Sequence, residues 1–143
     1  MIKGVIASKE KVIQNNQGNI FHVIKKESSG FSGFGEAYIS AIKYRSIKAW
    51  KMHHEMTLNL FVVIGKVKFV VCDNSNKENI FETFDLSDKE NLRLTIPPKL
   101  WVGFRGETEG ESLILNIADI PHRDDELTRK NIDEINFDWE QIK

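Results

Sequence analysis

Residues 48–55, Lys-Ala-Trp-Lys-Met-His-His-Glu, form the part of the sequence richest in side chains that can hold or move a proton. Successive side chains of a β-strand point to opposite faces. On a strand, Lys51 and His53 therefore share one face, while Trp50 and His54 share the other. A Lys and a His that converge inside a barrel would be an unusual pair to bury without a purpose. The alternative is a polar strand end whose side chains lie in solvent.

A second group of candidate residues lies at 96–104, Ile-Pro-Pro-Lys-Leu-Trp-Val-Gly-Phe. The two prolines fix an extended backbone where the segment begins. Trp101 and Phe104 offer flat apolar surface, and Gly103 between them lets backbone approach closely. A segment of this kind serves either as a corner of the core or as a platform for a ligand.

Several common catalytic motifs are absent from the sequence. It contains no Walker A loop, no dinucleotide fingerprint after a strand and no G-x-S-x-G elbow. Residues 30–35, Gly-Phe-Ser-Gly-Phe-Gly, lack those spacings and precede a predicted strand, so they indicate a flexible turn. Cys72 lies in an apolar run, which favours a small buried hydrophobic side chain over a nucleophile.

Length, charge and cysteine content narrow the class of protein. The 143 residues suit one domain, and 20 Lys and Arg against 21 Asp and Glu leave a net charge of −1. This balance gives no electrostatic reason to expect nucleic acid or an anionic membrane as a partner. Apolar runs such as 60–64 and 67–72 are too short to span a bilayer. A single cysteine and a charged N-terminus predict a cytoplasmic protein.

Alternation with a period of two residues predicts a protein made mostly of β-strands. The strongest strand candidates are 36–42, 92–96 and 111–118, and weaker ones are 19–25 and 80–86. Residues 58–64 and 67–72, separated by Gly65 and Lys66, predict a β-hairpin. The charged segment 122–130 predicts a short surface helix or an extended tail. Strands at this spacing indicate an antiparallel sandwich or a small barrel.

These segments, in this order, resemble the cupins of the dTDP-4-dehydrorhamnose 3,5-epimerase group and the related dTDP-sugar 3,4-ketoisomerases. Phe34-Gly35-Glu36 resembles the F-x-E segment of the family, and residues 48–53 stand in place of R-G-L-H-x-Q or R-G-x-H-A-H. Residues 62–73 are similar to the V-x-G-x-V hairpin that follows. Residues 96–104 are similar to I-P-x-G-x-x-H-G-F. The resemblance covers roughly residues 30 to 126 and predicts an all-β, cupin-type double-stranded β-helix, or jelly roll.

The sequence departs from this family at the positions that carry its chemistry. The catalytic His of the epimerases aligns with Lys51, and their catalytic Tyr aligns near Leu115. Their C-terminal segment with the Asp partner of that His finds no counterpart. The first His of the ketoisomerase motif is also replaced by Lys51, whereas the second is retained as His53. The His of the second motif is replaced by Trp101-Val102, so we expect no metal and no other cofactor.

The resemblance implies a single cupin domain over residues 1–143, with a core at about 18–120 and a C-terminal appendage at about 121–143. It also implies a site whose catalytic candidates are Lys51 and His53. The candidates for binding substrate are Phe34, Glu36, Lys48, Trp50, His54 and Trp101.

The implied activity is epimerisation or isomerisation of a keto-deoxysugar nucleotide in surface-polysaccharide or deoxysugar biosynthesis. This chemistry needs a base, an acid on the other side and a hydrogen-bond donor for the enolate. His53 is the candidate base, and Lys51 either stabilises the enolate or acts as the base. The alternatives are a cupin that binds a nucleotide sugar or glycan without turnover, and a jelly roll that only dimerises. The expected partners are a small-molecule nucleotide sugar and a second copy of the chain in a homodimer.

Overall fold

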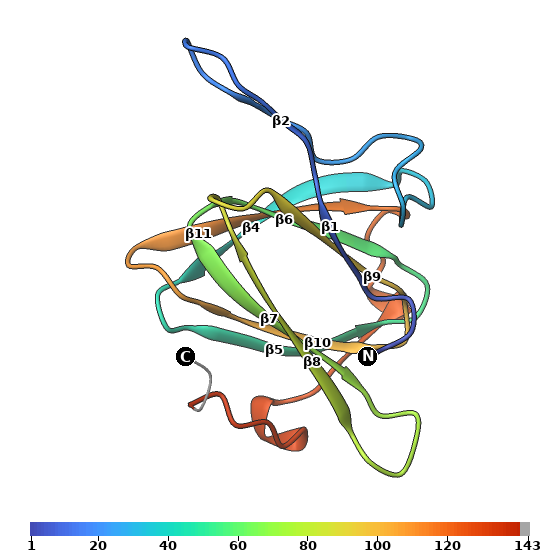
Figure 1. Ribbon diagram of the computed structural model, residues 1–143. Helices are drawn as coiled ribbons and strands as arrows, with labels where there is room; N and C mark the ends of the chain where they lie inside the picture. The colour runs from blue at the N-terminus through green and yellow to red at the C-terminus, as the bar shows by residue number, and fades with distance from the viewer. Residues whose placement is uncertain (141–143) are drawn as a thin grey trace.

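The computed structural model describes residues 1–140, which form two facing antiparallel sheets of five strands each (Figure 1). The order of strands is β1-β9-β6-β11-β4 in the first sheet and β12-β5-β10-β7-β8 in the second. The strands of the first sheet are β1 Ile6–Lys9, β4 Glu36–Lys43, β6 Leu58–Ile64, β9 Leu92–Ile96 and β11 Glu111–Ala118. Those of the second are β5 Ile47–His53, β7 Lys66–Asp73, β8 Ile80–Ser87, β10 Trp101–Gly106 and β12 Leu127–Arg129.

This arrangement confirms the all-β jelly roll that the sequence predicts. The alternating segments 92–96 and 111–118 become β9 and β11 with the same bounds. The weaker candidate at 19–25 contributes only the short strand β3, Ile20–Phe21. This strand pairs with β2, Val12–Ile13, in a separate hairpin that projects away from the body of the molecule (Figure 1).

The predicted hairpin between 58–64 and 67–72 is wrong. Both segments are strands, but β6 pairs with β9 and β11 in the first sheet, whereas β7 pairs with β10 and β8 in the second. Gly65 turns the chain from one sheet to the other with a φ of 92°, and a Cβ there would lie 2.2 Å from Ser112 Oγ. A glycine between two apolar runs fits this turn as well as it fits a hairpin turn. Here, however, the two strands that the turn connects lie in different sheets.

The hydrophobic core lies between the two sheets and includes Val62, Phe69 and Leu94, each at most 1% exposed. A second apolar cluster covers the outer face of the second sheet. It joins Trp50, Val70, Cys72 and Trp101 to Ile135 and Trp139 of the C-terminal segment. That segment contains two short 3-10 turns, Asp124–Glu126 and Ile132–Glu134, on either side of β12. Residues 122–130 are thus partly turn and partly strand. None of the helices in residues 1–140 has the length and apolar character of a membrane span.

Candidate active site in the cavity between the sheets

A cavity of about 860 Å³ opens between the two sheets, and strand β5 supplies Lys48, Lys51 and His53 to its lining. Lys51 and His53 lie on its wall, as alternation along the strand predicts. Lys48 also lies on the wall, although alternation alone would turn it outward. The reason is the register of β5 against β10, where Lys51 pairs with Val102 but Lys48 pairs with Phe104. This extra residue in β5 is a bulge that brings Lys48 back to the inner face.

His53 forms a buried pair with Glu126, whose side chain reaches it from the C-terminal segment. His53 is 6% exposed and Glu126 is 1% exposed. His53 Nδ1 hydrogen-bonds to Glu126 Oε1, and Glu126 Oε2 accepts the backbone N–H groups of Glu55 and Met56 at 3.3 Å each. The next residue, Leu127, begins β12 directly opposite His53, so strand pairing positions the carboxylate. The sequence did not identify this acidic partner.

The surroundings of the pair keep Glu126 ionised and His53 neutral. Burial by itself raises the pKa of Glu126, but the hydrogen bonds from His53 and the backbone outweigh it and hold this pKa below its ordinary value. Burial lowers the pKa of His53, and the charge of Lys51 lowers it further, against the opposing effect of Glu126. Nδ1 of neutral His53 therefore donates its hydrogen to the Glu126 carboxylate. Nε2 is left with a lone pair that can accept a proton, as a general base requires.

Three of the four described cations that line the cavity lie on β5 and β12, while the fourth, Lys130, has its Nζ over the Trp101 ring at 4.9 Å. Arg129 on β12 stands opposite Lys51 on β5, and both residues line the cavity together with Lys48. Within residues 1–140, no carboxylate forms an ion pair with any of the three. Burial lowers the pKa of Lys51, and the charges of Arg129 and Lys48 lower it further. A wall of unpaired cations favours an anionic ligand.

The opposite wall is formed by the first sheet and presents a phenol. Tyr38 on β4 and Asn116 on β11 are directly opposite each other, and both line the cavity. Asn116 Nδ2 donates a hydrogen bond to Tyr38 Oη at 3.0 Å. Partial burial raises the pKa of Tyr38, so the phenol is protonated at neutral pH. Tyr38 is not among the candidates that the sequence indicates. Its only signal was a place on a strongly alternating strand.

The structure does not bring all of the sequence-predicted residues into the cavity. Trp50 borders it, but its ring packs in the outer cluster, and its Nε1 donates to Ile132 O at 3.2 Å. Trp101 packs in the same cluster beneath Lys130. Of the described residues that line the cavity, none is Trp101, Phe34, Glu36 or His54.

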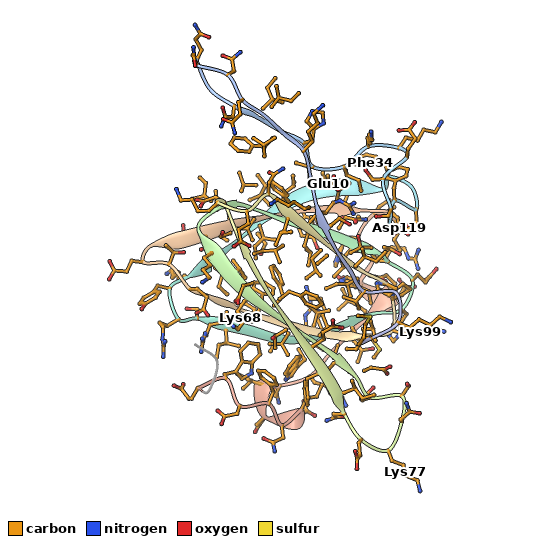
Figure 2. The ribbon with its side chains drawn as sticks, in the orientation of Figure 1. Glu10, Phe34, Lys68, Lys77, Lys99 and Asp119 are labelled. Carbon is orange, nitrogen blue, oxygen red and sulfur yellow. The ribbon has the colours of Figure 1, made fainter. Side chains whose placement is uncertain are left out.

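These other candidates lie around the two walls. Phe34 is 67% exposed on the loop before β4, near Asp119 (Figure 2). The side chain of Glu36 accepts the backbone N–H of His122 at 2.6 Å rather than pairing with Lys51. His54 Nε2 hydrogen-bonds to Thr128 Oγ1 at 2.7 Å. A role for these residues in binding stays a prediction.

The donors that a metal would need are not gathered in the described structure. At the cupin positions for two of the ligands stand Lys51 and Val102, which are neighbours on β5 and β10. Within residues 1–140, no three His, Cys, Asp or Glu side chains lie close enough together to hold a metal ion. Metal independence remains a prediction to be measured.

Comparison with solved structures identifies similar molecules. A dTDP sugar isomerase from Desulfovibrio desulfuricans G20 superposes with a TM-score of 0.91 and 31% identity over 99% of this chain and 94% of that chain. A dTDP-4-dehydrorhamnose 3,5-epimerase from Elizabethkingia anophelis NUHP1 gives 0.80 with 16% identity, covering 96% of this chain and 82% of that chain. A mutant 3,4-ketoisomerase from Thermoanaerobacterium thermosaccharolyticum, in complex with TDP-4-keto-6-deoxyglucose, gives 0.77 with 20% identity over 91% and 90%. The last two likenesses show the fold alone. No protein-family model matches the chain, and no curated protein matches it.

Proposed function

The chain belongs to the family of the dTDP sugar isomerase from Desulfovibrio desulfuricans, and we propose that it is an enzyme that isomerises or epimerises a keto-deoxysugar nucleotide. The observation that carries the proposal is that His53, which lines the cavity, is hydrogen-bonded to the buried carboxylate of Glu126. A neutral imidazole that donates Nδ1–H to a carboxylate and presents Nε2 to a cavity is arranged as a general base.

The reaction follows from the acidity of a C–H bond next to a ketone. His53 Nε2 takes this proton, and the electron pair of the C–H bond moves to the carbonyl oxygen, giving an enolate. The imidazolium is stabilised by the charge of Glu126. The Lys51 ammonium lies on the same wall and stabilises the negative oxygen. When the proton returns to carbon, the ketone forms again and no atom is gained or lost.

The cationic wall supports a nucleotide diphosphate as the anionic part of the substrate. Lys48 and Arg129 both border the cavity and have no ion-pair partner in the described structure. Arg binds phosphate oxygens in a bidentate manner, and Lys binds them as a point charge. A deoxysugar joined to a nucleoside diphosphate would place its charge here and its ketone near His53. We place the reaction in the cytoplasm, in deoxysugar or surface-polysaccharide biosynthesis.

The test uses the full chain with dTDP-4-keto-6-deoxyglucose in deuterated water, with C3 and C5 followed by NMR. We expect exchange of C–H for C–D at one or both carbons. The exchange rate should fall by at least about 100-fold in His53→Gln, which removes the base. His22→Gln is the matched control, because His22 is an exposed histidine next to the projecting hairpin. Chemical-shift changes without exchange would show a binding protein and contradict the proposed activity.

We further propose that two copies pair through the outer face of the first sheet. Ile39 on β4 is 62% exposed, and Val63 and Ile64 on β6 are 41% and 51% exposed. Exposed apolar side chains on β4 and β6, the two strands that flank β11, favour burial against another surface, and pairing would also protect the edge strands. Sedimentation should give twice the 16.5 kDa of one chain. Ile39→Lys should shift the protein to monomer, and a wild-type monomer at micromolar concentration would contradict the pairing.

A further inference from the structure

The cavity has a deep end and an open end, and the exposure of its residues along β5 distinguishes the two. His53 is 6% exposed, Lys51 is half-buried and Lys48 is exposed, and all three line the cavity. Each residue of a strand advances by about 3.3 Å, so His53 and Lys48 lie roughly 15 Å apart along β5. A ligand whose reacting end reaches His53 therefore has its other end near Lys48 and the opening.

The C-terminal segment follows the cavity from its deep end to its open end. Because β12 is antiparallel to β5, Arg129 stands opposite Lys51, and the backbone of the next residue, Lys130, exchanges hydrogen bonds of 2.9 and 3.0 Å with Trp50. The 3-10 turn Ile132–Glu134 comes next and packs beside β5. This turn therefore lies at the open end, beyond the cations.

The lining of the open end differs chemically from the cationic wall. Ile132 and Glu134 of the turn contribute to it, together with Ile47 at the start of β5. Ile132 is 43% exposed although its side chain is apolar. Of the described residues that line the cavity, Glu134 is the only one with a carboxylate. A carboxylate beside the cations opposes the binding of phosphate, so its position suits a different part of the ligand, one that donates a hydrogen.

The carboxylate of Glu134 is oriented by its own turn and has one oxygen left over. The backbone N–H of Asn131 donates to Glu134 Oε2 at 2.5 Å, and the N–H of Glu134 donates to Asn131 O at 3.0 Å. Within residues 1–140, no group donates a hydrogen bond to Oε1, and no cation forms an ion pair with Glu134. An ionised carboxylate only accepts hydrogen bonds, so Oε1 is available to a hydroxyl or N–H group of a ligand.

We propose that Glu134 Oε1 accepts a hydrogen bond from the 3′-hydroxyl of the nucleotide's deoxyribose, so that the turn Ile132–Glu134 forms the nucleoside subsite. This inference rests on the proposed function and names the residue that recognises the pentose. In a nucleotide sugar the pentose follows the diphosphate, and in the cavity Glu134 follows the cations. Deoxyribose has a single free hydroxyl, which matches the single free oxygen. The carbon atoms of its ring pack against Ile132, whereas Phe34 and Glu36 lie outside the lining.

The experiment measures the affinity of the full chain for dTDP and for 2′,3′-dideoxythymidine diphosphate by titration calorimetry. The two ligands differ only in the 3′-hydroxyl. We expect the wild-type protein to bind the dideoxy compound about tenfold more weakly, as is typical when a hydrogen bond to a charged group is lost. In Glu134→Gln the carbonyl oxygen still accepts the Asn131 N–H, because glutamine also serves at this position of a turn, and an NH₂ group replaces Oε1. The two affinities should then lie within about threefold of each other.

Two controls separate a hydrogen bond from a general effect of charge. Asp133→Asn removes the same charge from the same turn, at an exposed residue that is not part of the lining, and should keep the tenfold preference. Inorganic pyrophosphate has the phosphates but no pentose. It should bind Glu134→Gln at least as tightly as wild type, because the variant has lost a negative charge near the anion.

The outcomes distinguish this subsite from the proposed activity. Equal affinity of the wild-type protein for dTDP and its dideoxy analogue would overturn the assignment, and so would a tenfold preference that persists in Glu134→Gln. Weaker binding of pyrophosphate by Glu134→Gln would also overturn it, because the carboxylate would then support the phosphate site and not the pentose. A preference that depends on Glu134, in a protein that shows no C–H exchange, would support the subsite and contradict the proposed activity.

Discussion

Glu126→Gln is the substitution whose consequence the structure defines most sharply. The change is isosteric and removes only the charge and one acceptor. Glu126 Oε2 accepts two backbone N–H groups, from Glu55 and Met56, so the oxygen of the introduced amide should stay on that side. The NH₂ group of the amide then faces His53 Nδ1, which must become the acceptor. The hydrogen of the neutral imidazole moves to Nε2, and the base loses its lone pair toward the cavity.

The magnitude follows from the bond that is lost. A hydrogen bond to a charged group contributes about 1.5–3 kcal/mol. At about 1.36 kcal/mol for each factor of ten, its loss from the transition state lowers the rate by about 10- to 150-fold. The unfavourable tautomer adds to this, so we expect a decrease in kcat of at least about 100-fold. The pKa of His53 should also fall further, because both contributions of Glu126 act to raise it.

The assay pairs exchange kinetics with ¹⁵N NMR of the histidine ring, which reports directly which nitrogen carries the hydrogen. Wild type should show Nδ1–H at His53 near pH 8, and Glu126→Gln should show Nε2–H. Glu55→Gln is the matched control, since the exposed Glu55 side chain pairs only with Arg123 in the described structure. Wild-type exchange in Glu126→Gln, or Nδ1–H retained at His53, would refute the reasoning.

Three further predictions concern two groups that line the cavity, Lys51 and His53, and one buried cation outside its lining, Arg93. Lys51→Ala should lower kcat by about 100-fold, as expected for the loss of one group that stabilises an enolate. Lys51→His should retain more activity, and both variants should fold normally. An unchanged kcat in Lys51→Ala would contradict this role. The urea midpoint should fall as the pH drops from 7 to 5, because the lowered pKa of His53 means that the unfolded chain binds a proton below about pH 6.5 that the folded protein excludes. His53→Gln should flatten that slope, and an unchanged slope would assign it to other groups. Arg93→Met should lower the free energy of unfolding in urea by about 3–5 kcal/mol. The reason is that Arg93 is 0% exposed and that removing its guanidinium leaves the partly buried Glu10 unpaired. A decrease of less than about 1 kcal/mol would be inconsistent with that burial.

The sequence predicted well those features that depend only on residues close together along the chain. Alternation along one strand is enough to place Lys51 and His53 on a common face, and it also locates β9 and β11. Pairing between strands is not local, so the pattern around Gly65 predicts a hairpin although β6 and β7 lie in different sheets. Lys48 shows the same limit within the site, because it reaches the inner face only through the register of β5 against β10.

Glu126 and Tyr38 could not be assigned from the sequence because their roles depend on residues far along the chain. Glu126 lies 73 residues from His53, and Tyr38 lies 78 residues from Asn116. In the sequence, Glu126 ends an acidic run after Asp124 and Asp125, and such a run is usually a solvated surface. The structure separates the three residues because the 3-10 turn ends at Glu126 and Leu127 immediately pairs with His53. That pairing draws one carboxylate into the protein, where two backbone donors and an imidazole satisfy it. The same acidic run thus contains two solvent-exposed carboxylates, those of Asp124 and Asp125, and one buried carboxylate, that of Glu126, which orients His53.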